Sequence, residues 1–321
     1  MKKTLKAQLL ASIAMMLVAI VALSGATYAW FTASANPQVS LINLGVKGAD
    51  GLFLSADPNA VYTDITDWRT SIDRTNINDR QGGSGAVIPA ESIFALTNVS
   101  GVFYEASTAY GNFFKATTFL PDGTPTAYVA ANPIVGATGD YVKFSLWAKL
   151  TSGKGLFALD VADADAASWV KNVTTGVPGG IKHTIRIGFV PTAADGTSPE
   201  FNNAVIWEPN HNDHVAAIDG GKYSAAGFQA TSALTAVGGT TATQTTQYNP
   251  SNKAWAGYTA LGTAKLGLFA LDATDLAGAP ENAAKRFDVY VWVEGADGDT
   301  VNSVANSVFS TLLQFTLVAP N

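Results

Sequence analysis

The stretch 286-RFDVYVWVE-294 has the most regular alternation of apolar and polar residues in the chain. Phe287, Val289, Val291 and Val293 occupy every second position, so they point to one face of an extended strand. We therefore expect a strand with this row of side chains on the core face of a β-sheet.

Similar short apolar stretches recur along the whole chain, separated by turn signals. They cover residues 38–47, 51–55, 126–129, 141–150, 156–161, 184–190, 203–207, 265–271 and 307–318. Many short strands with no repeated helical pattern predict an all-β protein, either a β-sandwich or a jelly roll with long loops and short helices. No shift in composition marks a second domain, so residues 48–321 are expected to form one β-sandwich domain.

Three segments between these strands are predicted not to be strands. Residues 163–173 (DADAASWVKNV) are the best helix candidate because an Asp lies near their start and a Gly-Val-Pro-Gly-Gly run follows them. Residues 59–85 are polar and are expected to be irregular. Residues 222–265, rich in Thr and Gly, are expected to form an extended surface loop.

One short sequence motif occurs three times along the chain, and we call it the sequence echo. GLFLSAD at 51–57 is followed by GLFALD at 155–160 and by the same hexapeptide at 267–272. The echo indicates either equivalent strands of a sandwich, each entered through Gly and left through an Asp turn, or an internal duplication.

Composition excludes several classes of site. The chain has no cysteine, which excludes disulfides, thiolate zinc sites and cysteine nucleophiles. Only 14% of its residues are charged, and a weakly charged surface suits an extracellular protein that packs against its own copies. Its net charge of −6 and the absence of a basic run argue against nucleic acid as a partner.

The N-terminus has the layout of an export signal. Lys2, Lys3 and Lys6 precede an uncharged apolar run over residues 7–30, and small residues lie at its end. The run is long enough to be either a cleaved signal peptide or a retained membrane-anchor helix over residues 1–29. In both cases we expect the rest of the chain to lie outside the cell or on its surface, touching the membrane only through this segment.

The exit of this segment, 25-GATYAWFT-32, carries a family resemblance. It resembles the signal-peptide end of Gram-positive exported proteins processed by the dedicated signal peptidase SipW, a group that includes the biofilm-fibre protein TasA and camelysin. The stretches around 46–55, 205–210 and 290–299 are also similar to exported Firmicute proteins with this signal. The resemblance implies cleavage between Ala29 and Trp30, with the signal peptidase as a partner during export.

The resemblance also implies a jelly-roll subunit of an extracellular, biofilm-fibre-like filament or surface layer. In such fibres the N-terminal segment of one subunit completes the sheet of the next, by β-augmentation. Residues 30–47 are then the candidate donor segment. The expected interface residues are Val39, Leu41, Ile42, Leu44 and Val46. The alternative is that this stretch is the first strand of its own domain. The chain is longer than the core domain of this family. A type IV pilin would keep such an apolar helix inside its filament, but the Gly-Phe cleavage site followed by a Glu that pilins have is missing here.

Metal ligands are predicted in three acidic or histidine-containing segments. Glu294, Asp297, Asp299 and Asn302 offer closely spaced oxygens, which suit Ca²⁺, although they lack the full EF-hand register and an ordinary polar turn is the simpler interpretation. A second candidate site, for Zn²⁺ or Cu²⁺, combines Glu208, His211, Asp213 and His214. The third candidate group is Asp160, Asp163 and Asp165. No other cofactor is expected.

The sequence offers little for catalysis and one alternative to a fibre. It contains no nucleophile-elbow, zinc-protease, P-loop or dinucleotide motif, so we do not expect an enzyme. Trp147 and Trp292 lie on the faces opposite the apolar rows of their strands. If they are exposed there, they could stack sugar rings in a carbohydrate-binding or adhesion module. Cover by a second sheet or a neighbouring subunit is the other interpretation.

Overall fold

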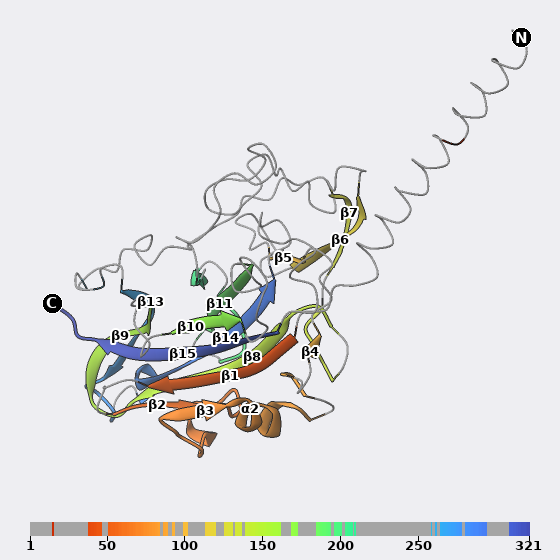
Figure 1. Ribbon diagram of the computed structural model, residues 1–321. Helices are drawn as coiled ribbons and strands as arrows, with labels where there is room; N and C mark the ends of the chain where they lie inside the picture. Colours follow the sequence, from red (N-terminus) through yellow and green to blue (C-terminus); the bar gives the residue numbers. More distant parts are fainter. Residues whose placement is uncertain are drawn as a thin grey trace, which may run out of the picture.

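The computed structural model describes residue 15, residues 38–46 and 51–83, and residues 86–321 with gaps, the longest being 102–112, 173–183, 210–257 and 294–307. The described part is almost entirely β-structure, arranged in two larger sheets and one small one (Figure 1). The apolar run over 7–30 and the cleavage residues Ala29 and Trp30 lie outside the described residues. Within the described residues no helix is long and apolar enough to cross a membrane.

The first large sheet, sheet A, contains both ends of the β-domain. Its strand order is β13-β9-β15-β1-β3, with β10 also paired to β15 and β4 also paired to β1. The bounds are β1 Gln38–Val46, β3 Ser71–Asp73, β4 Ser92–Ile93, β9 Gly153–Asp160, β10 Trp169–Asn172, β13 Lys265–Ala273 and β15 Val308–Val318. The pairing of β1 with β15 is parallel, whereas every other described pair in this sheet is antiparallel.

The second large sheet, sheet B, is antiparallel throughout, in the order β12-β11-β14-β8-β2. The bounds are β2 Leu52–Ser55, β8 Val142–Leu150, β11 Ile185–Pro191, β12 Val205–Trp207 and β14 Ala284–Val293. Residues 286–293 of the alternating stretch thus lie in the central strand of this sheet, as the alternation predicts. A small third sheet consists of β5 Val99–Gly101, β6 Phe113–Phe119 and β7 Pro125–Ala130.

Sheets A and B pack face to face around one apolar core. Phe157 of β9 stacks on Phe269 of β13 and on Phe315 of β15, both at 4.9 Å between ring centroids. Phe287 of β14 reaches this cluster from the other sheet, 5.6 Å from Phe157. All four rings are almost completely buried, so the all-β sandwich predicted from the alternation is confirmed.

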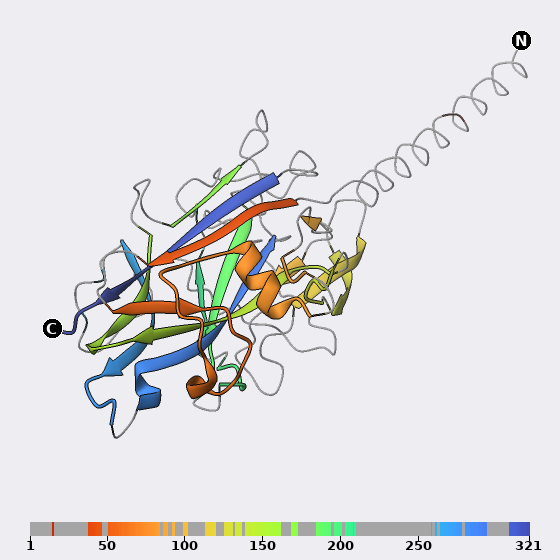
Figure 2. The ribbon, with the colours of Figure 1, turned by 90° about the horizontal axis from the view of Figure 1, so that it is seen from below.

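Short helices lie among the described strands. The 3-10 helix η1 Tyr62–Asp64 and the α-helix α2 Arg74–Gln81 follow β2, and the 3-10 helix η6 Pro280–Ala283 leads into β14. Figure 2 shows α2 beside β1 and β3. The capping box of α2 is formed by Asp73 and Asn76, each side chain accepting from the other residue's backbone N–H.

Two of the predictions about the connecting segments are wrong. Residues 169–172, in the predicted helix, form strand β10, because Val170 is buried while Trp169 and Lys171 face outward with the period of a strand. The segment 59–85, expected to be irregular, contains η1, β3 and α2. The predicted loop 222–265 lies almost wholly outside the described residues.

Candidate functional site

Strand β1, the predicted donor segment, lies inside sheet A of its own chain. It pairs with β15 in parallel from Gln38 opposite Val308 to Val46 opposite Phe315, with one register shift between Val39 and Leu41. Its second edge meets β4 near Gln38 and β3 near Leu44. Because β1 has neighbours on both sides, sheet A is incomplete without it.

The side chains of β1 carry the apolar contribution that the sequence predicts. Ile42 and Leu44 are 0% and 2% exposed in the core, and the half-buried Val46 packs against them. The side chains of Val39 and Leu41 are outside the described residues. Gly45 lies opposite Gln314, and a methyl group on Gly45 would come within 2.5 Å of the Gln314 side-chain nitrogen.

The other edge of β15 is also filled, by two strands in line. β10 pairs with residues 309–312 of β15 and β9 with residues 315–318. Ser168 fills the gap between them, because its hydroxyl accepts from the backbone N–H of Gln314 at 2.8 Å and donates to the Gln314 carbonyl at 3.3 Å. Both edges of β15 are thus paired within the described residues. Of its partners β1, β9 and β10, β1 is the one from the N-terminal end of the chain.

The segment 56–81, which we call the cover segment, lies over the outer face of sheet B at Trp147 through its residues 59–68, and its later part contains β3 of sheet A and the helix α2. Its last helical residue, Gln81, bonds to β8 as a neighbouring strand would: its side-chain oxygen accepts from the N–H of Ser145 at 2.9 Å, and its amide donates to the Ser145 carbonyl at 2.5 Å. The same amide donates to the carbonyl of Ala56 at 2.8 Å. Asn78 bonds to the backbone of Ile88 in the same way as Gln81 does to Ser145. Its side-chain oxygen accepts from the N–H of Ile88 at 2.9 Å, and its amide donates to the Ile88 carbonyl at 2.5 Å.

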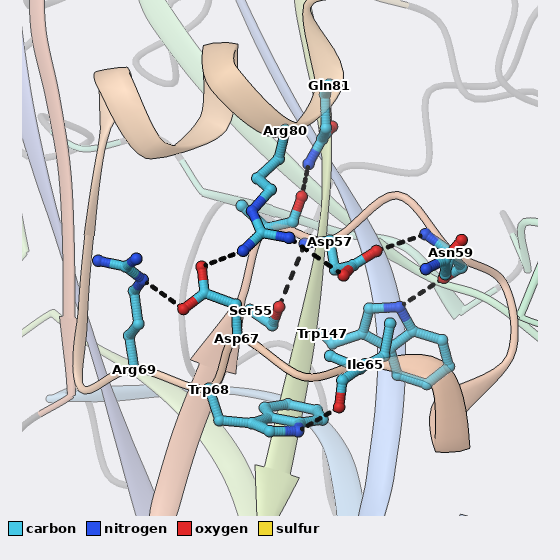
Figure 3. A network of polar contacts seen from close by, with 11 residues as sticks. Ser55, Asp57, Asn59, Ile65, Asp67, Trp68, Arg69, Arg80, Gln81 and Trp147 are labelled. Carbon is cyan, nitrogen blue, oxygen red and sulfur yellow. Dashed lines mark hydrogen bonds and ion pairs between the residues drawn. The ribbon is translucent and has the colours of Figure 1, made fainter.

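A chain of ion pairs joins residues within the cover segment. Arg80 bridges the buried Asp57 at 3.5 Å and Asp67 at 3.0 Å, and Asp67 also pairs with Arg69 at 2.8 Å (Figure 3). The backbone carbonyl of Asn59 accepts the indole N–H of Trp147 at 2.9 Å. These contacts hold the cover segment over strand β8.

A second polar cluster lies on the same face of sheet B. Asp288 accepts from the Ser145 hydroxyl at 2.6 Å and pairs with Lys143 at 3.0 Å, while Arg286 donates to the Ser145 hydroxyl at 3.0 Å. Burial, with the charge of Asp288 and its hydrogen bond, raises the pKa of Tyr290 far above its usual value.

Burial also raises the pKa of Tyr141, which stacks on Tyr290, to about 12. The Ser145 hydroxyl donates to the Asp288 carboxylate, which is also paired with Lys143. The cluster pairs the carboxylate of Asp288 beneath the cover, whereas the buried Nε of Arg286 has no hydrogen-bond partner among the described residues.

The expectation that Trp147 and Trp292 form an exposed aromatic surface is wrong. Trp147 is 4% exposed and Trp292 is 0% exposed. Trp147 packs with Ile65 and Ala284 beneath the cover segment, so its strand has no wet face there. The half-buried rings of this region are Tyr62 and Trp68, which lie 5.5 and 5.1 Å from the ammonium group of Lys149.

The predicted metal ligands fall mostly outside the described residues. This applies to Glu294, Asp297, Asp299 and Asn302, to Asp163 and Asp165, and to Glu208, His211, Asp213 and His214. Asp160 is described and buried, and its carbonyl accepts from the N–H of Ser168 at 2.8 Å. Among the described residues no three His, Cys, Asp or Glu side chains come together to hold a metal. The Ca²⁺ site stays a prediction.

The cover segment contains the functional side chains that sequence reasoning missed. The sequence does contain a helix-start signal there, because Asp73 and Asn76 have the spacing of a capping box. However, α2 buries only Ile77, so its sequence shows no apolar stripe.

Comparisons with protein-family models, with curated proteins and with solved structures find no match for this chain.

Proposed function

We propose that this chain is a secreted structural subunit of an extracellular filament or surface layer, assembled head to tail by donation of strand β1. The observation that carries the proposal is the place of β1: it comes from the N-terminal end of the chain, yet it lies inside sheet A between β15 and the short strands β3 and β4. The proposed role is structural rather than enzymatic, it requires no cofactor, and the partner is another copy of the chain.

The contacts of β1 suit exchange between copies. They consist of backbone pairing with β15, β3 and β4 and of two apolar side chains, Ile42 and Leu44, which enter the core. The β1 strand of a neighbouring copy makes the same contacts in the same register. Each copy then gives one strand and receives one, and such a heterologous contact repeats without closing.

Residues 47–51 are the link that this exchange changes. In the sequence they connect β1 of sheet A to β2 of sheet B. In the assembled form these residues run from one subunit to the next. The export signal, the predicted cut after Ala29 and the jelly-roll topology implied by the family resemblance fit this proposal.

The test uses the chain that begins at Trp30. We expect filaments by negative-stain electron microscopy, and a chain lacking residues 30–47 should form none. A synthetic peptide of residues 30–47 should bind the truncated chain and raise its melting temperature, because it fills the position of β1. The matched control is the same peptide with Leu44→Asp, which places a carboxylate in the core and should not bind.

Two outcomes contradict the proposal. One is a full chain from Trp30 that stays strictly monomeric under all assembly conditions. The other is assembly that is unchanged when residues 30–47 are deleted.

A further inference from the structure

The two copies of the hexapeptide GLFALD lie side by side in sheet A. Residues 155–160 belong to β9 and residues 267–272 to β13, and the two strands pair antiparallel. Phe157 lies directly opposite Phe269, and the two rings stack at 4.9 Å. The fold therefore pairs this sequence with a copy of itself.

The pairing is complementary in charge as well as in shape. Each segment has a lysine near its start and an aspartate at its end. In the antiparallel register Lys265 lies opposite Asp160, and Asp272 lies opposite Lys154. Lys154 contributes to the lowered pKa of Asp272, after the hydrogen bonds from Thr274. Opposite charges at cross-strand positions stabilise an antiparallel pair, and like charges destabilise it.

The second edge of β13 has no strand beside it in the part of the chain that the structure describes. β13 is the terminal strand of sheet A, and residues 265–273 make no backbone hydrogen bond on that edge to the described residues. Ala270 is exposed, and Lys265 and Asp272 are half-exposed.

The other terminal strands of the two described large sheets are much shorter than β13. β13 has nine residues, whereas β3 and β12 have three each and β2 has four. The edge of β2 is also occupied, because Leu54 and Arg69 exchange two backbone hydrogen bonds of 2.7 and 2.8 Å. A long edge strand is a site for strand addition.

We propose that this edge of β13 pairs antiparallel with β13 of a second copy of the chain across a two-fold axis. The second copy presents the hexapeptide that β9 presents within the chain. Lys265 of each copy then lies near Asp272 of the other, so the charged pair occurs twice. This contact is isologous and joins two subunits side by side. It is separate from the head-to-tail contact through β1 and does not depend on it.

Charge exchange on β13 tests the contact. With Lys265→Asp alone, an aspartate faces Asp272 of the other copy at both symmetry-related positions. With Asp272→Lys alone, a lysine faces Lys265 of the other copy at both positions. We expect each single variant to raise the dissociation constant of the side-by-side pair by about tenfold. The double variant, with both exchanges, restores opposite charges between copies and should restore pairing.

The double variant also separates pairing from stability. Within each chain it places an aspartate opposite Asp160 and a lysine opposite Lys154, so thermal melting should remain lowered while pairing recovers. Lys154→Ala is the matched control, since it changes the internal partner of Asp272 and leaves the β13 edge intact. It should leave pairing unchanged.

The measurement is sedimentation equilibrium for the unassembled chain from Trp30 and filament width by electron microscopy for any assembled form. Side-by-side pairs that fall apart in the single variants and return in the double variant support the inference. A wild-type chain that shows no paired species, or a double variant that pairs no better than the single ones, overturns it. Filaments of single width refute only this inference, and pairs without filaments refute only the head-to-tail proposal.

Discussion

Strand β1 and the cover segment 56–81 both complete a sheet, but they do so with different contacts. β1 offers peptide groups to β15 along its whole length and places Ile42 and Leu44 in the core. The cover segment holds strand β8 through individual side chains, among them Gln81 on the backbone of Ser145. Peptide groups are the same in every strand, whereas the side-chain contacts require particular residues on both partners.

The difference indicates which part of the molecule can be exchanged between copies. A ladder such as that of β1 is specified by register and by an alternating apolar row, and an identical strand reproduces both. The cover segment is tied to the rest of its own chain by particular side chains, Gln81 on Ser145 and Asn78 on Ile88. We therefore expect β1 to leave and rejoin the sandwich more readily than the cover segment does, and the following substitutions test that contrast.

Leu44→Ala should give the largest loss. Leu44 is 2% exposed, and removing a buried leucine costs about 2–5 kcal/mol of unfolding free energy. The neighbouring Val46→Ala is the control, because Val46 is only half-buried and should cost about 1 kcal/mol. Urea denaturation of the unassembled chain measures both. If Val46→Ala proves the more damaging of the two, β1 does not occupy this position in solution.

Gln81→Ala should give the next largest loss. It removes three hydrogen bonds and leaves the N–H and carbonyl of Ser145 without these partners, at a cost of about 2–3 kcal/mol. Asp79→Ala, on the exposed side of the same helix, should stay within about 0.5 kcal/mol of wild type. Equal stability of the two variants would show that Gln81 does not hold the cover segment to β8.

Arg80→Ala should cost about 1 kcal/mol, a modest loss because the arginine side chain is 39% exposed and partly screened by water. The loss arises mainly at Asp57, whose side chain is 6% exposed and is left buried without this partner. Arg69→Ala is the surface control, since Arg69 is 45% exposed. Denaturation in low and high salt measures both, and the Arg80→Ala loss should shrink as salt rises.

Alkaline pH should give the smallest effect. The pKa values of Tyr141 and Tyr290 are raised in the folded chain, to about 12 for Tyr141. The folded state therefore keeps these protons after the unfolded state begins to lose them, at about pH 10. Stability contributed by these groups is complete below that pH and falls as pH rises from about 10 to 12.

Tyr290→Phe removes one of these two groups. Denaturation curves recorded from about pH 8 to about pH 11.5 should show a shallower alkaline decline for this variant than for wild type. A decline as steep as that of wild type would mean that Tyr290 is not buried beside Asp288.

The inner face of the sandwich could be predicted from the sequence because it is built from alternation. In β8 the row from Val142 to Leu150 is buried as expected, and the strands at 184–190, 203–207, 265–271 and 307–318 are confirmed with small changes of bounds. A strand packed on a core leaves a period of two in its sequence, and that pattern does not depend on which strand it faces.

The outer face of sheet B could not be predicted in the same way. Trp147 and Ser145 alternate with the apolar row of β8, yet the cover segment lies over Trp147 and bonds to the backbone of Ser145. Its contacts are side chain to backbone and join residues 64 positions apart, as between Gln81 and Ser145. Such contacts leave no periodic signal, and α2 buries only Ile77, so its helix is invisible to a search for an apolar stripe.

The parallel pairing of β1 with β15 also decides when the chain can finish folding. Gln38 and Val308 are partners although about 270 positions separate them, and no earlier described strand meets this edge of β1. Sheet A therefore stays open until the last strand has left the ribosome. Contacts this distant in sequence slow folding, because the loop must close before the contact gives any stability. A chain that loses its final strand keeps β1 with only the short strands β3 and β4 beside it, so we expect the last residues to govern the folding rate as strongly as the first.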